Sequence, residues 1–149
     1  MTERSALAVI LAAGDGTRMR SSLPKVMHPV AGLPMLGHVL KAASAAGIEH
    51  KVAVVGAGAS AVGKFLAKAA PDVLVAEQAE RLGTAHAVLA ARSVLVAEPD
   101  DVLVLYGDTP LVTEETLRRM RAALAEGASV VVLGFRPADP TGYGRLIEE

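Results

Sequence analysis

Two glycines and two cations follow the first apolar run of the chain. Gly14 and Gly16 come just after the run Leu7–Leu11, and Arg18 and Lys25 follow them. Glycine has no Cβ, so backbone N–H groups can approach a ligand closely, and guanidinium and ammonium groups bind phosphate oxygens. The spacing therefore predicts a site for a polyanion, with a nucleoside triphosphate as the expected ligand. The alternative is a glycine-rich turn that only closes a tight corner.

A carboxylate follows a later apolar run, Val102–Tyr106. Gly107 and Asp108 come directly after this run, so Asp108 is expected beyond the end of a strand. Mg²⁺ takes one or two protein carboxylates together with phosphate oxygens, which makes Asp108 the candidate metal ligand. Asp is also common in turns and helix caps, and that interpretation stays open.

A third loop carries groups suited to a nucleobase. Gln78 offers both a donor and an acceptor, and Gly83 and Thr84 stand just before a helical pattern that starts at Ala85. These residues could hydrogen-bond a base or a phosphate. Thr84 could equally be a plain helix N-cap. The spacing favours neither interpretation.

The glycine-rich stretch 56–65 is not expected to bind a nucleotide. Taken as a P-loop that begins at Gly58, it has Phe65 where a Ser or Thr must hold Mg²⁺. Taken as a dinucleotide fingerprint, it has Ala61 in place of the third glycine. A tight turn between a strand and a helix is sufficient to explain it.

Short apolar runs alternate with helical patterns along the chain. The expected strands are Leu7–Leu11, Val52–Val55, Val73–Ala76, Val102–Tyr106 and Val130–Leu133. The expected helices are Met35–Ala46, Ala61–Ala69, Ala85–Val96 and a segment capped by Thr113 that ends at Gly127. Non-alternating apolar runs are typical of strands that are buried on both faces. The order predicts an α/β fold, a Rossmann-like three-layer αβα sandwich with a mostly parallel sheet. Ligands of such sheets bind beyond the carboxyl ends of the strands.

The segment Pro140–Arg145 is rigid and rich in glycine. Its residue types favour a turn before a last strand, Arg145–Ile147. A backbone surface for a sugar ring is the alternative.

Composition excludes several classes of function. The chain has 149 residues, a net charge of −1 and 3% aromatic residues, so it lacks the basic field and stacking platforms of nucleic-acid-binding proteins. It has no cysteine, which excludes disulfides and thiol catalysis and fits a reducing cytoplasm. The four histidines share no metal-ligand spacing, and His38 is expected to be packed or half exposed in a helix. No run approaches the roughly 18 apolar residues of a membrane span.

Taken together, the motifs resemble the sugar nucleotidyltransferase superfamily. The resemblance rests on residues 11–19 (Leu-Ala-Ala-Gly-Asp-Gly-Thr-Arg-Met) with Pro24-Lys25-Val26, and it extends over residues 28–32, 82–87, 106–111 and 139–145. The segments Leu-Gly-Thr-Ala-His at 82–86 and Thr-Gly-Tyr-Gly-Arg at 141–145 narrow the resemblance to one family of this superfamily. They are similar to the uridylyltransferase domain of bacterial N-acetylglucosamine-1-phosphate uridylyltransferases.

The resemblance implies Mg²⁺-dependent transfer of UMP from UTP to N-acetylglucosamine 1-phosphate in the cytoplasm. The products would be pyrophosphate and UDP-N-acetylglucosamine, a precursor of peptidoglycan and lipopolysaccharide. Arg18 and Lys25 would hold the triphosphate as catalytic residues, Asp108 the metal, and Gly144 the sugar. The further substrate contacts that the motifs imply are Leu11, Ala12, Ala13, Gly14, Gln78, Gly83, Thr84, Tyr106 and Gly107.

Members of this family continue well beyond the length of this chain. Their later segments supply a second metal ligand, further sugar contacts and a β-helix acetyltransferase domain that builds a homotrimer. Residues 1–149 are therefore expected to be the N-terminal part of one nucleotidyltransferase domain, with the UTP half of the site present and the sugar half incomplete. The alternatives are another sugar-1-phosphate nucleotidyltransferase and a noncatalytic nucleotide-binding module of the same fold.

Overall fold

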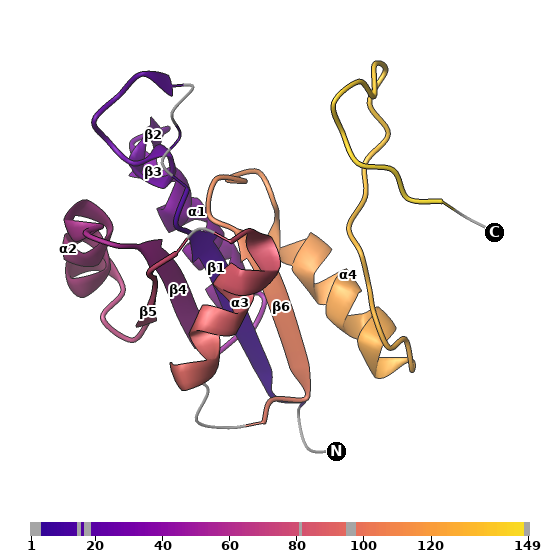
Figure 1. The fold of residues 1–149 in the computed structure, drawn as a ribbon. Helices are drawn as coiled ribbons and strands as arrows, with labels where there is room; N and C mark the ends of the chain where they lie inside the picture. The colour runs from indigo at the N-terminus through magenta and orange to yellow at the C-terminus, as the bar shows by residue number, and fades with distance from the viewer. Residues whose placement is uncertain (1–3, 15, 17–18, 81, 95–97, 148–149) are drawn as a thin grey trace.

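A four-stranded parallel sheet lies at the centre of the chain (Figure 1). The computed structural model describes residues 4–14, 16, 19–80, 82–94 and 98–147. The sheet has the order β5-β4-β1-β6, and its three pairings are all parallel. Its strands are β1 (Ala6–Ala12), β4 (His50–Gly56), β5 (Leu74–Gln78) and β6 (Asp101–Tyr106). A small antiparallel pair, β2 (Pro29–Val30) with β3 (Leu33–Pro34), lies apart from it.

Helices cover both faces of the sheet, so the predicted three-layer α/β sandwich is confirmed. The helices of one face are α1 (Met35–Ala45), α2 (Ser60–Ala69) and α4 (Glu114–Ala125), which share one buried cluster. The other face is covered by α3 (Thr84–Ala90) and its 3₁₀ continuation η3 (Ala91–Val94). A further 3₁₀ turn, η2 (Lys25–Met27), precedes the small β-pair. Within the described residues, no helix is long and apolar enough to cross a membrane.

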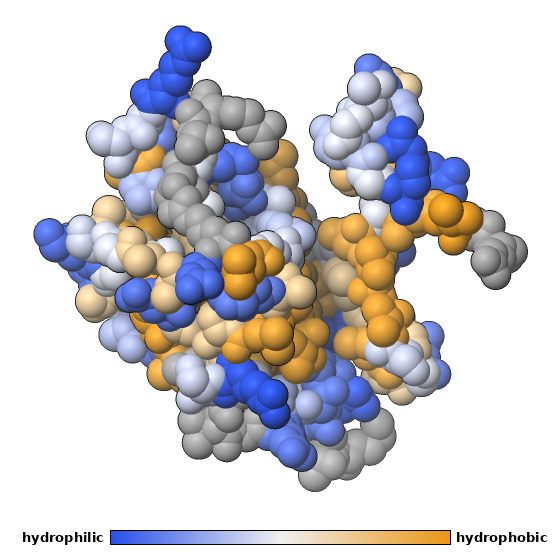
Figure 2. All heavy atoms as spheres, viewed as in Figure 1, coloured by the Kyte–Doolittle hydropathy of each residue, from blue (hydrophilic) through white to orange (hydrophobic). Residues whose placement is uncertain are grey.

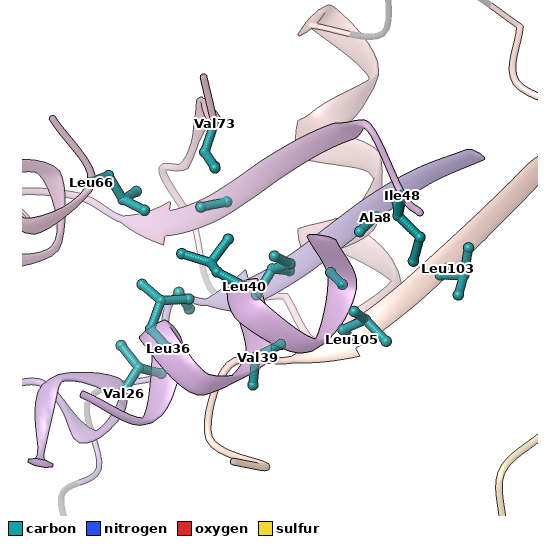
Figure 3. Close-up of a cluster of buried hydrophobic side chains, with 14 of the residues drawn as sticks. Ala8, Val26, Leu36, Val39, Leu40, Ile48, Leu66, Val73, Leu103 and Leu105 are labelled. Atoms are coloured by element: carbon teal, nitrogen blue, oxygen red, sulfur yellow. The ribbon is translucent and has the colours of Figure 1, made fainter. Parts of the chain in front are cut away.

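The larger core cluster lies between α1 and the sheet (Figure 3). Leu36, Val39 and Leu40 recur at helical spacing, so α1 presents one apolar stripe to the strands. Ile10 of β1 is completely buried in the same cluster. This packing fixes α1 and the loop before it against the centre of the sheet.

The outer strand β6 differs from the sequence prediction, because only one of its faces is buried. Leu103 and Leu105 are buried, whereas Val102, Val104 and Tyr106 are 49%, 42% and 51% exposed. These three side chains lie on the face that α3 covers, and α3 packs over β1, β4 and β5. An edge strand of the sheet therefore keeps an apolar but open face.

The predicted strands Val130–Leu133 and Arg145–Ile147 are wrong. Residues 128–147 contain neither helix nor strand, and they run away from the sheet after α4 (Figure 1). Figure 2 shows apolar residues along the surface of this tail, and Val130 is 77% exposed. The segment has strand-like composition, but no described strand lies beside it to complete its backbone hydrogen bonds.

Candidate active site

One pocket lies at the carboxyl ends of β1, β5 and β6, with a cavity volume of about 320 Å³. The strands end at Ala12, Gln78 and Tyr106, so the loops that follow them share one rim of the sheet. The pocket is lined by Leu11, Ala13, Gly14, Lys25, Val26, Gln78, Gly83, Thr84, Ala87, Tyr106 and Asp108. The rim that parallel sheets use for ligands thus carries three of the loops that the sequence singles out.

A lysine and an aspartate meet in this pocket although 83 positions separate them in the chain. Lys25 Nζ lies 2.6 Å from Asp108 Oδ2, and the two side chains are 39% and 29% exposed. Lys25 begins η2, and Asp108 follows the end of β6 by two residues. The two charges neutralise each other in this ion pair. A ligand that carries both phosphate and a cation could replace it, because the phosphate would bind the lysine and the cation would bind the aspartate.

Gly16 determines how closely the glycine loop approaches Lys25. Gly16 has φ +60°, and a Cβ built on it would lie 2.6 Å from Lys25 Cβ. Any larger residue would therefore push the lysine and strain the backbone. The glycine allows the loop after β1 to pack directly against the side chain that faces Asp108.

Gln78 ends β5 with its amide in a fixed environment. Its Nε2 lies 3.2 Å from the Gly83 carbonyl oxygen and 3.1 Å from His86 Nδ1. The residue is only 5% exposed, yet it lines the pocket. A buried polar residue that lines a cavity is suited to orient a ligand.

Three of the described residues that were predicted for the site do not line this pocket. Ala12 is 3% exposed and packs into the core on the opposite side of β1 from Leu11, because successive residues of a strand point to opposite faces. Gly107 is buried, and its N–H donates to the Leu11 carbonyl at 2.9 Å. Gly144 lies in the tail, where it lines a separate hollow. Arg18 lies outside the described residues.

Two lining residues are absent from the sequence prediction. Val26 follows Lys25 directly, its side chain is buried, and both residues line the pocket. Ala87 stands one helical turn after Thr84, so both face the same side of α3. The signal for both residues was local spacing from a predicted neighbour.

Asp108 is the candidate protein ligand for a metal ion. Within the described residues, no group of three or more His, Cys, Asp or Glu side chains gathers that could hold a metal. A carboxylate of this exposure fits a hard cation such as Mg²⁺ when phosphate oxygens supply further ligands. None of the four histidines lines the pocket, and half-exposed His38 approaches the Val30 carbonyl with Nε2 at 2.8 Å.

The family is decided by a match over nearly the whole chain. Residues 8–146 match the model of the MobA-like NTP transferase domain. The chain belongs to this nucleotidyltransferase family. It is 61% identical to the bifunctional protein GlmU of Xanthobacter autotrophicus and 59% identical to that of Bradyrhizobium sp. (strain ORS 278), over 147 residues each. Each match covers 99% of this chain, and the chain spans about a third (33%) of each relative's length.

Solved structures of nucleotidyltransferases share the fold. A nucleotidyl transferase of Methanothermobacter is 29% identical with a TM-score of 0.69, over 80% of this chain and 58% of the other. UTP-bound UGPase from Acinetobacter baumannii is 25% identical with a TM-score of 0.67, over 83% and 53%. A Mycobacterium tuberculosis protein in complex with manganese is 28% identical with a TM-score of 0.63, over 82% and 60%. The chain is thus a nucleotidyltransferase, the enzyme class that the sequence motifs predict.

Proposed function

We propose that the chain provides the nucleotide site of an enzyme that transfers UMP from UTP to N-acetylglucosamine 1-phosphate. The observation that carries the proposal is the Lys25–Asp108 pair in the pocket at the strand ends, with Nζ and Oδ2 2.6 Å apart. A triphosphate with its cation matches this pair in charge. The identity with bifunctional GlmU proteins and the likeness to UTP-bound UGPase support uridine as the nucleoside.

In this proposal, different residues of the described chain bind different parts of the nucleotide. Gln78 and Gly83 would lie against the base. The space beside the Cα of Gly14 is open, since a Cβ built there would meet nothing within 4 Å, so the phosphates could approach the backbone at this residue. Lys25 would turn from Asp108 to the triphosphate. Asp108 would then hold Mg²⁺, which when bound supplies positive charge to the phosphate oxygens. Gly144, placed in the tail, would meet the sugar.

The reaction needs positioning rather than a protein nucleophile. A phosphate oxygen of the sugar phosphate forms a bond to the α-phosphorus of UTP, and the bond from that phosphorus to the bridging oxygen breaks. Pyrophosphate leaves with the electron pair of that bond. Lys25 stabilises the negative charge that develops on the phosphates, and Gln78 keeps the nucleoside in line.

Calorimetric titration of the whole chain with UTP, in Mg²⁺ and in EDTA, tests the nucleotide site. We expect binding at one site that weakens when the metal is removed, because Asp108 and the triphosphate then repel each other. Titrations with CTP, dTTP and GTP compare the bases. No heat of binding with UTP in Mg²⁺, or tighter binding of another triphosphate, would contradict the proposal.

Gly16→Ala should weaken UTP binding several-fold, because its Cβ would displace Lys25. It should also cost roughly 1–2 kcal/mol of stability, since an L-residue is strained at positive φ. Gly58→Ala is the matched control: Gly58 has φ +74°, but a Cβ there meets nothing within 4 Å. Thermal unfolding and UTP titration of both variants separate the two effects. Equal UTP affinity in the two variants would show that contact with Lys25 is irrelevant.

A further inference from the structure

The side-chain amide of Gln78 is held in one orientation by two acceptors. Its Nε2 faces both the Gly83 carbonyl oxygen and His86 Nδ1, at 3.2 and 3.1 Å. A backbone carbonyl can only accept a hydrogen bond, so the amide atom opposite Gly83 must be the nitrogen. That nitrogen has two hydrogens, and the second goes to His86. Nδ1 of His86 is therefore an acceptor, and the ring proton of the neutral histidine lies on Nε2.

This orientation decides what Gln78 can offer a ligand. Both amide hydrogens are engaged, so the amide can bind a ligand through its carbonyl oxygen. A carbonyl oxygen accepts, and it therefore suits a base whose ring carries an N–H. Uracil and thymine have such a hydrogen on N3. The N3 of cytosine has a lone pair instead, which would face a second acceptor in a buried position.

We infer that His86 is a positioning residue that makes the site prefer a uracil-type base over cytosine. Together with the Gly83 carbonyl it accepts from Gln78 Nε2, and so it opposes a 180° turn of the amide, which would present N–H groups to the base. His86 is not among the residues that line the pocket, and it acts through Gln78. The inference rests on the proposed function, because it requires the base of UTP to lie against Gln78.

The test compares the dissociation constants of CTP and UTP, measured by calorimetry in Mg²⁺ on the whole chain. His86→Phe keeps a ring and removes the acceptor, and the CTP-to-UTP ratio should fall about tenfold, the value of one hydrogen bond. His86→Asn restores an acceptor oxygen close to the place of Nδ1 and should keep the ratio. His50→Phe is the control, because His50 is exposed at the opposite end of β4 from Gly56, the partner of Gln78.

Three results of the titrations would overturn the inference. They are an unchanged ratio in His86→Phe, an equal loss in His86→Phe and His86→Asn, and a wild-type chain that does not prefer UTP to CTP. Nitrogen-15 spectra of the histidine rings give a readout that needs no nucleotide: the proton of neutral His86 should lie on Nε2, and a proton on Nδ1 contradicts the geometry. Failure of the wild-type chain to bind UTP is the failure of the proposed function, seen before any variant is made.

Discussion

Replacing Lys25 by alanine should weaken UTP binding by roughly 10- to 150-fold. A hydrogen bond to a charged partner contributes about 1.5–3 kcal/mol, and each 1.4 kcal/mol is tenfold in affinity. The folded state should change little, because Lys25 and Asp108 are 39% and 29% exposed and such pairs are worth about 0–1 kcal/mol. Titration of the variant with UTP in Mg²⁺, beside its thermal unfolding curve, measures both quantities.

Lys64→Ala is the control for this variant. Lys64 is an exposed lysine of α2 that does not line the pocket, so its loss changes the net charge equally without removing a phosphate contact. A similar fall in affinity in both variants would mean that the overall field of the chain, rather than Lys25, attracts the nucleotide. Unchanged affinity in Lys25→Ala would remove the lysine from the site.

The central strands were predictable because their burial is written into their composition. Residues 6–12 of β1 are all apolar and 50–56 of β4 are largely so, and both strands have neighbours on each side. The start of helix α4 is also determined by neighbouring residues in the sequence. Thr113 accepts from the Thr116 N–H, and Glu114 and Glu115 occupy the first turn. These features need no knowledge of the rest of the molecule.

The tail could not be predicted in the same way. Residues 130–133 are Val-Val-Val-Leu, a strong strand signal. Strand propensity reports a fit to a sheet surface, and it does not supply the neighbouring strand. The same limit applies to Gly144, whose position depends on where the whole tail lies. The contact of Gly144 with a sugar remains a prediction.

The pocket was predictable as a set of loops but less so as single residues. The strand ends fix where Gly14, Gln78 and Asp108 gather, because parallel strands all point to one rim. Within the run 11–14, however, the pleat separates Leu11 and Ala13 from Ala12. The sequence motif assigns the whole run to the site, whereas successive side chains of the strand point alternately to the pocket and to the core.

Asp101→Ala should destabilise the fold by about 3–5 kcal/mol, because it leaves the largely buried guanidinium of Arg121 without its partner. Asp101 is 2% exposed at the start of β6. Its Oδ1 accepts from Arg4 Nη2 at 2.6 Å, and its Oδ2 lies 3.4 Å from Arg121 Nε. The hydrogen bond to this carboxylate also raises the pKa of Arg4. Chemical denaturation at neutral pH measures the loss.

The size of this loss follows from what Arg121 joins. Its side chain is 15% exposed, and its Nη groups donate to the carbonyls of Arg4 at 2.7 Å and Ala46 at 3.3 Å. Asp101 thus holds one arginine that ties α4 to the start of β1 and the end of α1. Asp101→Asn keeps an acceptor and should lose less than alanine, and exposed Glu98→Ala should stay within about 0.5 kcal/mol. Because five residue steps of β6, roughly 17 Å, separate Asp101 from the pocket, UTP affinity of the folded fraction should not change. A loss below about 1 kcal/mol in Asp101→Ala would mean that water reaches the freed guanidiniums and that the buried carboxylate holds nothing together.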